Sequence, residues 1–155
     1  MKIEIDQSGK IENTNRKTII AFSDTKNTKN GALVISARDK RSIQTHFRSI
    51  GKPRLFIHLS FVVLVYLLIK DRIKDYDQIV IDEEYPGYDK LLIQSLRNLL
   101  KISKVENVSI SIAQIGKKSP AHDLAWHELQ LRVQKVAKRI TSDEVIKVLK
   151  KSGSI

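Results

Sequence analysis

Two apolar segments of this chain each end on a carboxylate. Residues 2–5 lead into Asp6, and residues 78–81 lead into Asp82. If the two segments are neighbouring parallel strands, their carboxyl ends meet at a topological switch point, where open sheets form ligand crevices. We therefore expect Asp6 and Asp82 to lie together. A third acid, Asp123, follows the start of a predicted helix, and we expect it to approach the same point.

Clustered carboxylates suit phosphodiester hydrolysis. That reaction needs an activated water and charge stabilisation on the attacking and leaving oxygens, which two divalent ions about 4 Å apart can supply. Hard oxygen ligands favour Mg²⁺ or Mn²⁺, and we predict two such ions. The predicted metal ligands are Asp6, Asp82, Glu83, Glu84, Asp123 and His127. The predicted catalytic residues are Asp6, Asp82, Glu83 and Asp123, with His122 or His127 as an outer ligand or proton shuttle.

Each of these residues also has a purely structural explanation. Asp6 could be a turn residue at the end of a strand, since aspartate favours that position. Asp123 could complement the dipole of its own helix. At least one of Glu83 and Glu84 could be a solvated turn residue, and His127 could be an ordinary surface histidine. These alternatives stay open at the level of the sequence.

The charge of the chain points to an anionic polymer as its partner. The sequence has 28 Lys and Arg residues against 17 Asp and Glu residues, a formal net charge of +11. Such an excess is typical of nucleic-acid-binding proteins, although a basic surface can also serve solubility alone. The predicted nucleic-acid-binding residues are Arg38, Lys40, Arg41, Lys117, Lys118, Lys135, Lys138 and Arg139. Membrane-surface binding is disfavoured, because no row of exposed Trp or Phe accompanies the basic stretches.

Length and composition predict one main domain without disulfides. The chain has 155 residues and no cysteine, which excludes thiolate chemistry and zinc fingers and fits a reducing compartment. No secretory signal opens the sequence, so we expect a cytoplasmic protein. The most apolar run, residues 55–69, is shorter than the roughly 20 residues that span a bilayer. We expect it to be a buried helix.

Hydrophobic patterns predict five strands with helices between and after them. The predicted strands are residues 1–6, 17–23, 32–36, 78–82 and 108–113, with a polar hairpin loop at 24–31. The predicted helices are residues 38–50, 55–73, 88–102 and 119–140, followed by a short final helix that a capping box opens at Thr141. This order predicts an α/β layer structure with a mixed sheet.

Three short motifs in this order resemble the ribonuclease H-like superfamily. Asp6-Gln7-Ser8 is similar to the Asp-Gly-Ser that ends the first strand in ribonuclease H, and Asp82-Glu83-Glu84-Tyr85 resembles the acid that ends the fourth strand. His122-Asp123-Leu124-Ala125 is similar to the Asp-Leu-Ala pattern at the start of the last helix. The resemblance implies a five-stranded mixed sheet, three antiparallel strands and then two parallel, with helices on both faces. It implies a ribonuclease H-like domain over 1–140, and a short helix and tail over 141–155.

The same resemblance implies a divalent-metal-dependent nuclease. Its substrate would be an RNA·DNA hybrid or a branched DNA junction, and a resolvase-like enzyme would act as a homodimer. The chain departs from ribonuclease H in its first long helix, which has no glutamate. Besides Tyr66, the titratable residue that this helix offers is His58, which we expect in the core. The alternative is therefore a non-catalytic nucleic-acid-binding or assembly module. It would replace the nuclease mechanism if Asp123 points to solvent, well beyond the span of a two-metal cluster, with no mobile helix to bring it in. A small-molecule enzyme is disfavoured, because no Gly-rich phosphate loop is present.

Overall fold

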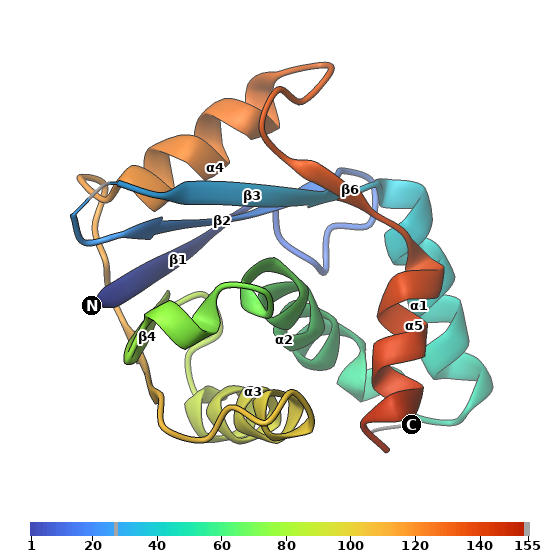
Figure 1. Ribbon diagram of the computed structural model, residues 1–155. Coiled ribbons are helices and arrows are strands. Elements are labelled where there is room, and N and C mark those ends of the chain that lie inside the picture. The colour runs from blue at the N-terminus through green and yellow to red at the C-terminus, as the bar shows by residue number, and fades with distance from the viewer. Residues whose placement is uncertain (27, 154–155) are drawn as a thin grey trace.

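One mixed sheet forms the centre of the molecule (Figure 1). In the computed structural model, which describes residues 1–26 and 28–153, its strands are β1 (Lys2–Ser8), β2 (Thr18–Asp24), β3 (Asn30–Ile35), β4 (Gln78–Asp82), β5 (Ser109–Ala113) and β6 (Lys138–Ile140). The strand order is β5-β4-β1-β2-β3-β6. β2 pairs antiparallel with β1 and β3, whereas β4 is parallel to β1, β5 to β4, and β6 to β3. The predicted mixed sheet is confirmed, but it has six strands rather than five.

Helices cover both faces of the sheet, as predicted. They are α1 (Ala37–Ser49), α2 (Phe56–Ile69), α3 (Asp89–Ile102), α4 (Pro120–Gln130) and α5 (Ser142–Lys151), with short 3₁₀ turns at Pro53–Leu55 and Ile73–Asp75. Figure 1 shows α4 on one face of the sheet and α1, α2, α3 and α5 on the opposite face. α4 packs mainly on β1 and β2. α4 is therefore the helix that covers β1, the strand that carries Asp6, on this face of the sheet.

The predicted helix over 119–140 is wrong in its second half. α4 ends at Gln130, and the chain then turns and adds β6 alongside β3. The buried carboxylate of Glu128 accepts hydrogen bonds from the backbone N–H groups of Lys135 and Val136, at 3.2 and 2.6 Å, and so folds the chain back on the helix end. A local hydrophobic pattern cannot anticipate this turn, because the partners of Glu128 lie beyond the helix.

α2 is the central helix of the core. Twelve of its 14 residues are buried, and it contacts α1, α3 and α5 as well as the sheet. This all-round burial explains why the segment is apolar on every side. Among the residues that the structure describes, none of the helices combines the length and the apolarity that crossing a membrane requires.

The C-terminal helix belongs to the same core as the sheet. Thr141 and Glu144 form the predicted capping box at the start of α5, and Val145 and Leu149 are buried against the main core. The expected short helix at the start of residues 141–155 is α5, and it packs on the main core through these two residues. Residues 154 and 155 of the expected tail, and Asn27 in the predicted hairpin loop, lie outside the described residues.

Candidate metal centre

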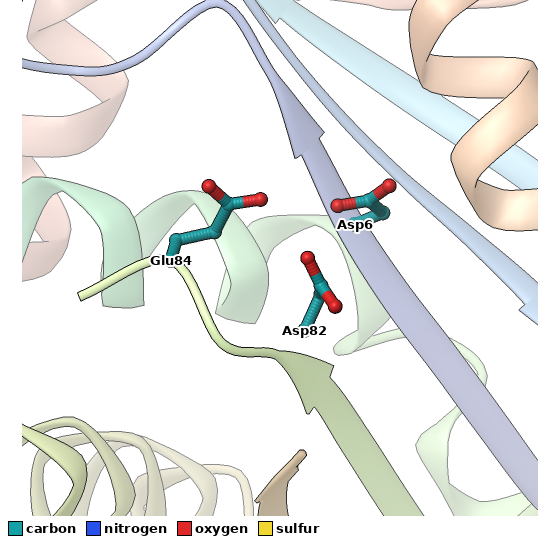
Figure 2. A group of neighbouring side chains, drawn as sticks. All are labelled: Asp6, Asp82 and Glu84. Carbon is teal, nitrogen blue, oxygen red and sulfur yellow. The ribbon is translucent and has the colours of Figure 1, made fainter. Parts of the chain in front are cut away.

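Three carboxylates meet beside the ends of β1 and β4. Because the strands are parallel, with Ile5 opposite Ile81, the next residues along them, Asp6 and Asp82, lie side by side. Asp6, Asp82 and Glu84 each offer one carboxylate oxygen, and these oxygens all lie within 4.8 Å of one another. Figure 2 shows the three side chains converging on one point, Asp6 from β1 and the other two from the end of β4 and the loop that follows it. The predicted meeting of Asp6 and Asp82 is confirmed.

Asp6 is the most enclosed of the three. Its side chain is 3% exposed. Its Oδ1 accepts a hydrogen bond from the backbone N–H of Gln7 at 2.8 Å, and its Oδ2 lies 2.8 Å from Nδ1 of His122. Burial raises the pKa of Asp6 above its ordinary value, although both contacts act in the opposite direction. The site thus holds a carboxylate in a place where its negative charge is poorly solvated.

Glu84 carries the largest electrostatic cost of the group. Burial and the neighbouring Asp6, followed by Asp82, raise the pKa of the Glu84 carboxyl to about 8. Asp82 is held in place by the backbone N–H of Ile115, which donates to its Oδ1 at 3.0 Å. Three acids crowded together in this way repel one another unless a cation or a shared proton offsets them. The donor set is all oxygen, which fits Mg²⁺ or Mn²⁺.

α4 presents His122, and not Asp123, to the carboxylates. Ala121, Ala125 and Leu129 are buried and mark the face of α4 that packs on the sheet. A helix turns by about 100° per residue, so His122 lies at the edge of that face and Asp123 lies almost opposite to it. Asp123 is accordingly exposed and outside the group of three carboxylates. The spacing of the three apolar residues is the sequence signal that could have predicted this.

Two further predicted ligands are not brought into the group. Glu83 is exposed, and its backbone N–H donates to the carbonyl of Ala113. His127 is exposed on α4, with its ring 5.1 Å from that of Trp126. His58 is a buried core residue, as expected, and its ring stacks on Tyr88 at a centroid distance of 3.8 Å.

Sequence reasoning missed the side chains that hold the loop after β4. The amide of Gln7 donates to the hydroxyl of Tyr85 at 3.2 Å, and both residues are buried. The ring of Tyr85 also packs edge-on against His58 and Phe61 of α2. The contact between Gln7 and Tyr85 therefore holds together the residue that follows Asp6 and the residue that follows Glu84. The sequence signal for this contact is the alternation of side chains along β1, which places Gln7 on the opposite face of the sheet from Asp6.

The predicted nucleic-acid-binding residues divide into one buried and seven exposed cations. Lys40 is 1% exposed, and its ammonium donates to the carbonyls of Lys10 and Asn13 and to the Thr18 hydroxyl. Lys40 therefore belongs to the interior, and its inclusion in the basic surface is corrected. The exposed ones are Arg38, Arg41, Lys117, Lys118, Lys135, Lys138 and Arg139.

Comparison with known proteins adds no assignment. A scan against protein-family models finds no match, and a search of curated proteins finds no similar sequence.

Proposed function

We propose that this protein is a divalent-metal-dependent nuclease of the ribonuclease H-like kind, which hydrolyses phosphodiester bonds in a structured nucleic acid. The observation that carries the proposal is the convergence of Asp6, Asp82 and Glu84 within 4.8 Å at the ends of two parallel strands. Burial raises the pKa of two of these acids, so the fold maintains a charge cluster that is costly by itself. A bound cation removes that cost.

Asp6, Asp82 and Glu84 would hold Mg²⁺ or Mn²⁺. Bound there, such ions would supply the charge that activates a water and stabilises the oxygens of the phosphodiester. Gln7 and Ile115 orient the carboxylates of Asp6 and Asp82 through backbone N–H groups. Asp6 in turn contacts Nδ1 of His122 through its Oδ2, at 2.8 Å, and so helps to fix the orientation of the ring. His122 is thereby placed to orient Asp6 or to exchange a proton beside it.

The basic surface would bind the phosphate backbone. Seven of the eight predicted cations are exposed, among them Lys117 and Lys118 in the loop that leads into α4. Contacts of this kind position a nucleic acid without reading its sequence. Hydrolysis of an RNA·DNA hybrid and cleavage of a branched DNA remain the two forms of the proposal, and the second would fit a homodimer.

A non-catalytic nucleic-acid-binding module is the second candidate function. The observation that favours it is the exposure of Asp123 on α4, outside the three-carboxylate group. The buried residues of α2 include His58 but no acid that could join the carboxylates. Against this alternative, Glu84 supplies a third carboxylate and His122 supplies a direct partner for Asp6.

The deciding experiment is a cleavage panel with Mg²⁺ or Mn²⁺. The substrates are a hybrid duplex, a four-way junction, a single strand and a plain duplex. We expect metal-dependent cleavage of at least one substrate, and we expect Asp6→Asn to reduce it by more than about 100-fold, since loss of a metal ligand costs at least as much as loss of an outer contact. The matched control is Glu106→Gln, which neutralises an exposed acid in the loop between α3 and β5.

Controls separate the two functions. Asp6→Asn should fold normally by circular dichroism and melt slightly higher than the unmodified protein in metal-free buffer, because one member of a repelling cluster is neutralised. Wild-type cleavage rates in Asp6→Asn would overturn the site assignment. Salt-sensitive binding without cleavage of any substrate would favour the binding module.

A further inference from the structure

The one tryptophan of the chain lies half-exposed on the helix that reaches the carboxylates. Trp126 is 50% exposed, although Trp is usually the most costly side chain to leave in water. It follows His122 by four residues on α4, which places it about one turn, or roughly 6 Å, further along the helix. Since His122 contacts Asp6, the indole stands one turn from the candidate metal centre.

The direction of α4 places Trp126 nearer than His122 to the carboxyl end of β1. The Ser119 hydroxyl donates to the carboxylate of Glu4 at 3.0 Å, and His122 contacts Asp6 further along the same strand. α4 and β1 thus run in the same direction. Trp126, one turn after His122, lies past Asp6 toward the end of the strand, where the chain leaves the sheet.

Trp126 also lies on the side of α4 that faces the metal centre. It is only about 40° around the helix from His122. The opposite side of α4 packs toward β3, where Leu124 contacts a cluster that includes Ala32 and Val34. The indole is therefore on the β1 and β4 side of the helix, together with His122.

The sheet surface on that side is open and lined by small residues. In the register of β4 and β5, Asp82 is opposite Ala113 and Val80 is opposite Ser111, so these side chains share one face of the sheet. Ala113 and Ser111 are exposed. A ligand next to Trp126 would therefore find room over β4, which carries Asp82, and over the neighbouring β5.

Cations border α4 at both of its ends. Lys117 and Lys118 are exposed in the loop that precedes the helix, and Arg132 and Lys135 are exposed in the loop that follows it. An aromatic ring with flanking cations is the combination that binds a nucleic-acid strand, where rings stack on bases and cations neutralise phosphates. A second copy of this chain would bring four like charges against these four and be repelled.

We propose that Trp126 stacks on an unpaired base of the nucleic-acid substrate, next to the bond that the metal centre cleaves. The proposal rests on the proposed function for its partner, and it narrows the substrate class. Both faces of a base inside a duplex are covered by its neighbours, so only an unpaired base can offer a face to the indole. The expected substrates are single-stranded, bulged or branched nucleic acids, rather than a fully paired hybrid.

His127 helps to hold the indole in place. Its ring lies 5.1 Å from that of Trp126 at an interplanar angle of 81°, which is a T-shaped contact rather than a stacked one. Stacking of one base on an aromatic side chain corresponds to a change in affinity of about 5- to 100-fold when the ring is removed. An effect of that size is measurable by titration.

Because Trp126 is the only tryptophan, the intrinsic fluorescence of the unmodified protein reports on this ring directly. The experiment titrates the protein with oligonucleotides in buffer with EDTA, so that no strand is cut. We expect a single strand and a duplex with a bulged base to quench the emission, and a long, fully paired hybrid to bind with little quenching. Trp126→Ala should weaken binding of the single strand by about 5- to 100-fold. Trp126→Phe should restore most of the affinity, and Leu91→Ala, which removes an exposed apolar side chain of α3, should have no effect.

The outcomes distinguish this inference from the proposed function. Binding of the single strand with unchanged emission overturns the stacking role, even if the protein cleaves nucleic acid. Quenching by the single strand, together with no cleavage of any of the four panel substrates in Mg²⁺ or Mn²⁺, supports the stacking role and overturns the nuclease. Emission that changes with protein concentration alone, without oligonucleotide, would assign the ring to contact between copies and would also overturn the inference.

Discussion

At the scale of single residues, the carboxyl group of Glu84 makes folding depend on pH. Burial and the charges of Asp6 and Asp82 raise its pKa from 4.5 to about 8 in the folded protein. Between these two values the folded state holds a proton that the unfolded chain releases, so stability in metal-free buffer should fall as pH rises from 4.5 toward 8. Metal binding should oppose that loss, because it requires the deprotonated form.

The corresponding variant is Glu84→Gln, which cannot titrate. We expect its free energy of unfolding in EDTA to fall less between pH 5 and pH 8 than that of the unmodified protein, and to exceed it at pH 8 by roughly 1–2 kcal/mol, since solvent screens part of the repulsion. Urea unfolding at the two pH values measures this. Parallel pH dependence in the two proteins would contradict the assignment of Glu84 to the cluster.

Lys40 is the residue whose role changes most between sequence and structure. Burial lowers the pKa of its ammonium to about 8, yet the group donates hydrogen bonds to the carbonyls of Lys10 and Asn13 and to Thr18. It thus ties α1 to the loop between β1 and β2. That loop follows β1, the strand that carries Asp6.

Replacing this ammonium should cost stability and not phosphate binding. We expect Lys40→Met to lower the free energy of unfolding by about 2–4 kcal/mol, because three acceptors lose their donor. Arg41→Ala is the matched control on the same helix, since Arg41 also bonds to this loop, at the Thr14 carbonyl, but is exposed. The control should cost less than about 1 kcal/mol. Loss of oligonucleotide affinity in folded Lys40→Met, measured at matched salt, would return Lys40 to the binding surface.

At the scale of elements, α4 and the loop after it depend on Glu128. Its buried carboxylate is the acceptor for the N–H groups of Lys135 and Val136, and the Gln134 amide donates to the carbonyls of Glu128 and Leu131. These bonds set the turn between α4 and β6. They also fix the positions of Arg132 and Lys135, the exposed cations of this loop.

Glu128→Gln tests this turn. An amide has one oxygen where the carboxylate has two, so one of the two N–H groups loses its acceptor, at a cost of about 1–3 kcal/mol. We expect faster hydrogen exchange at Lys135 and Val136 and little change in the amides of β1 and β4. Uniformly faster exchange across the sheet would show instead that Glu128 supports the whole fold.

At the scale of the whole molecule, the net charge of +11 predicts salt-dependent binding of nucleic acid. Each phosphate neutralised on B-form duplex contributes a slope of about −0.9 to the logarithm of affinity against the logarithm of salt concentration. The double variant Lys135→Glu and Lys138→Glu should flatten this slope and weaken binding similarly for all sequences. Arg139 is left unchanged because it forms an ion pair with Asp39 at 3.6 Å. An affinity that does not change from low to moderate salt would reject the basic-surface hypothesis.

Much of the fold could be predicted from local patterns in the chain. The alternation and apolar runs of β1 to β5 place each strand within a few residues, and the capping box at Thr141 starts α5 where expected. Asp6 and Asp82 could be paired in advance, because parallel strands bring their ends to one edge of the sheet. These features depend on residues close in the sequence or on a general rule of sheet topology.

The remaining features depend on partners far apart in the sequence. The buried face of α4, which turns His122 to Asp6 and Asp123 to solvent, follows from how the helix sits on β1 and β2. Glu84 joins the cluster because Tyr85 is anchored to Gln7, 78 residues earlier in the chain. The sequence by itself therefore determined β1 to β5, the starts of the helices, and the meeting of the two aspartates at the ends of two parallel strands. Only the tertiary structure decided which acids and which histidine complete the site, because that choice depends on how the elements pack against one another.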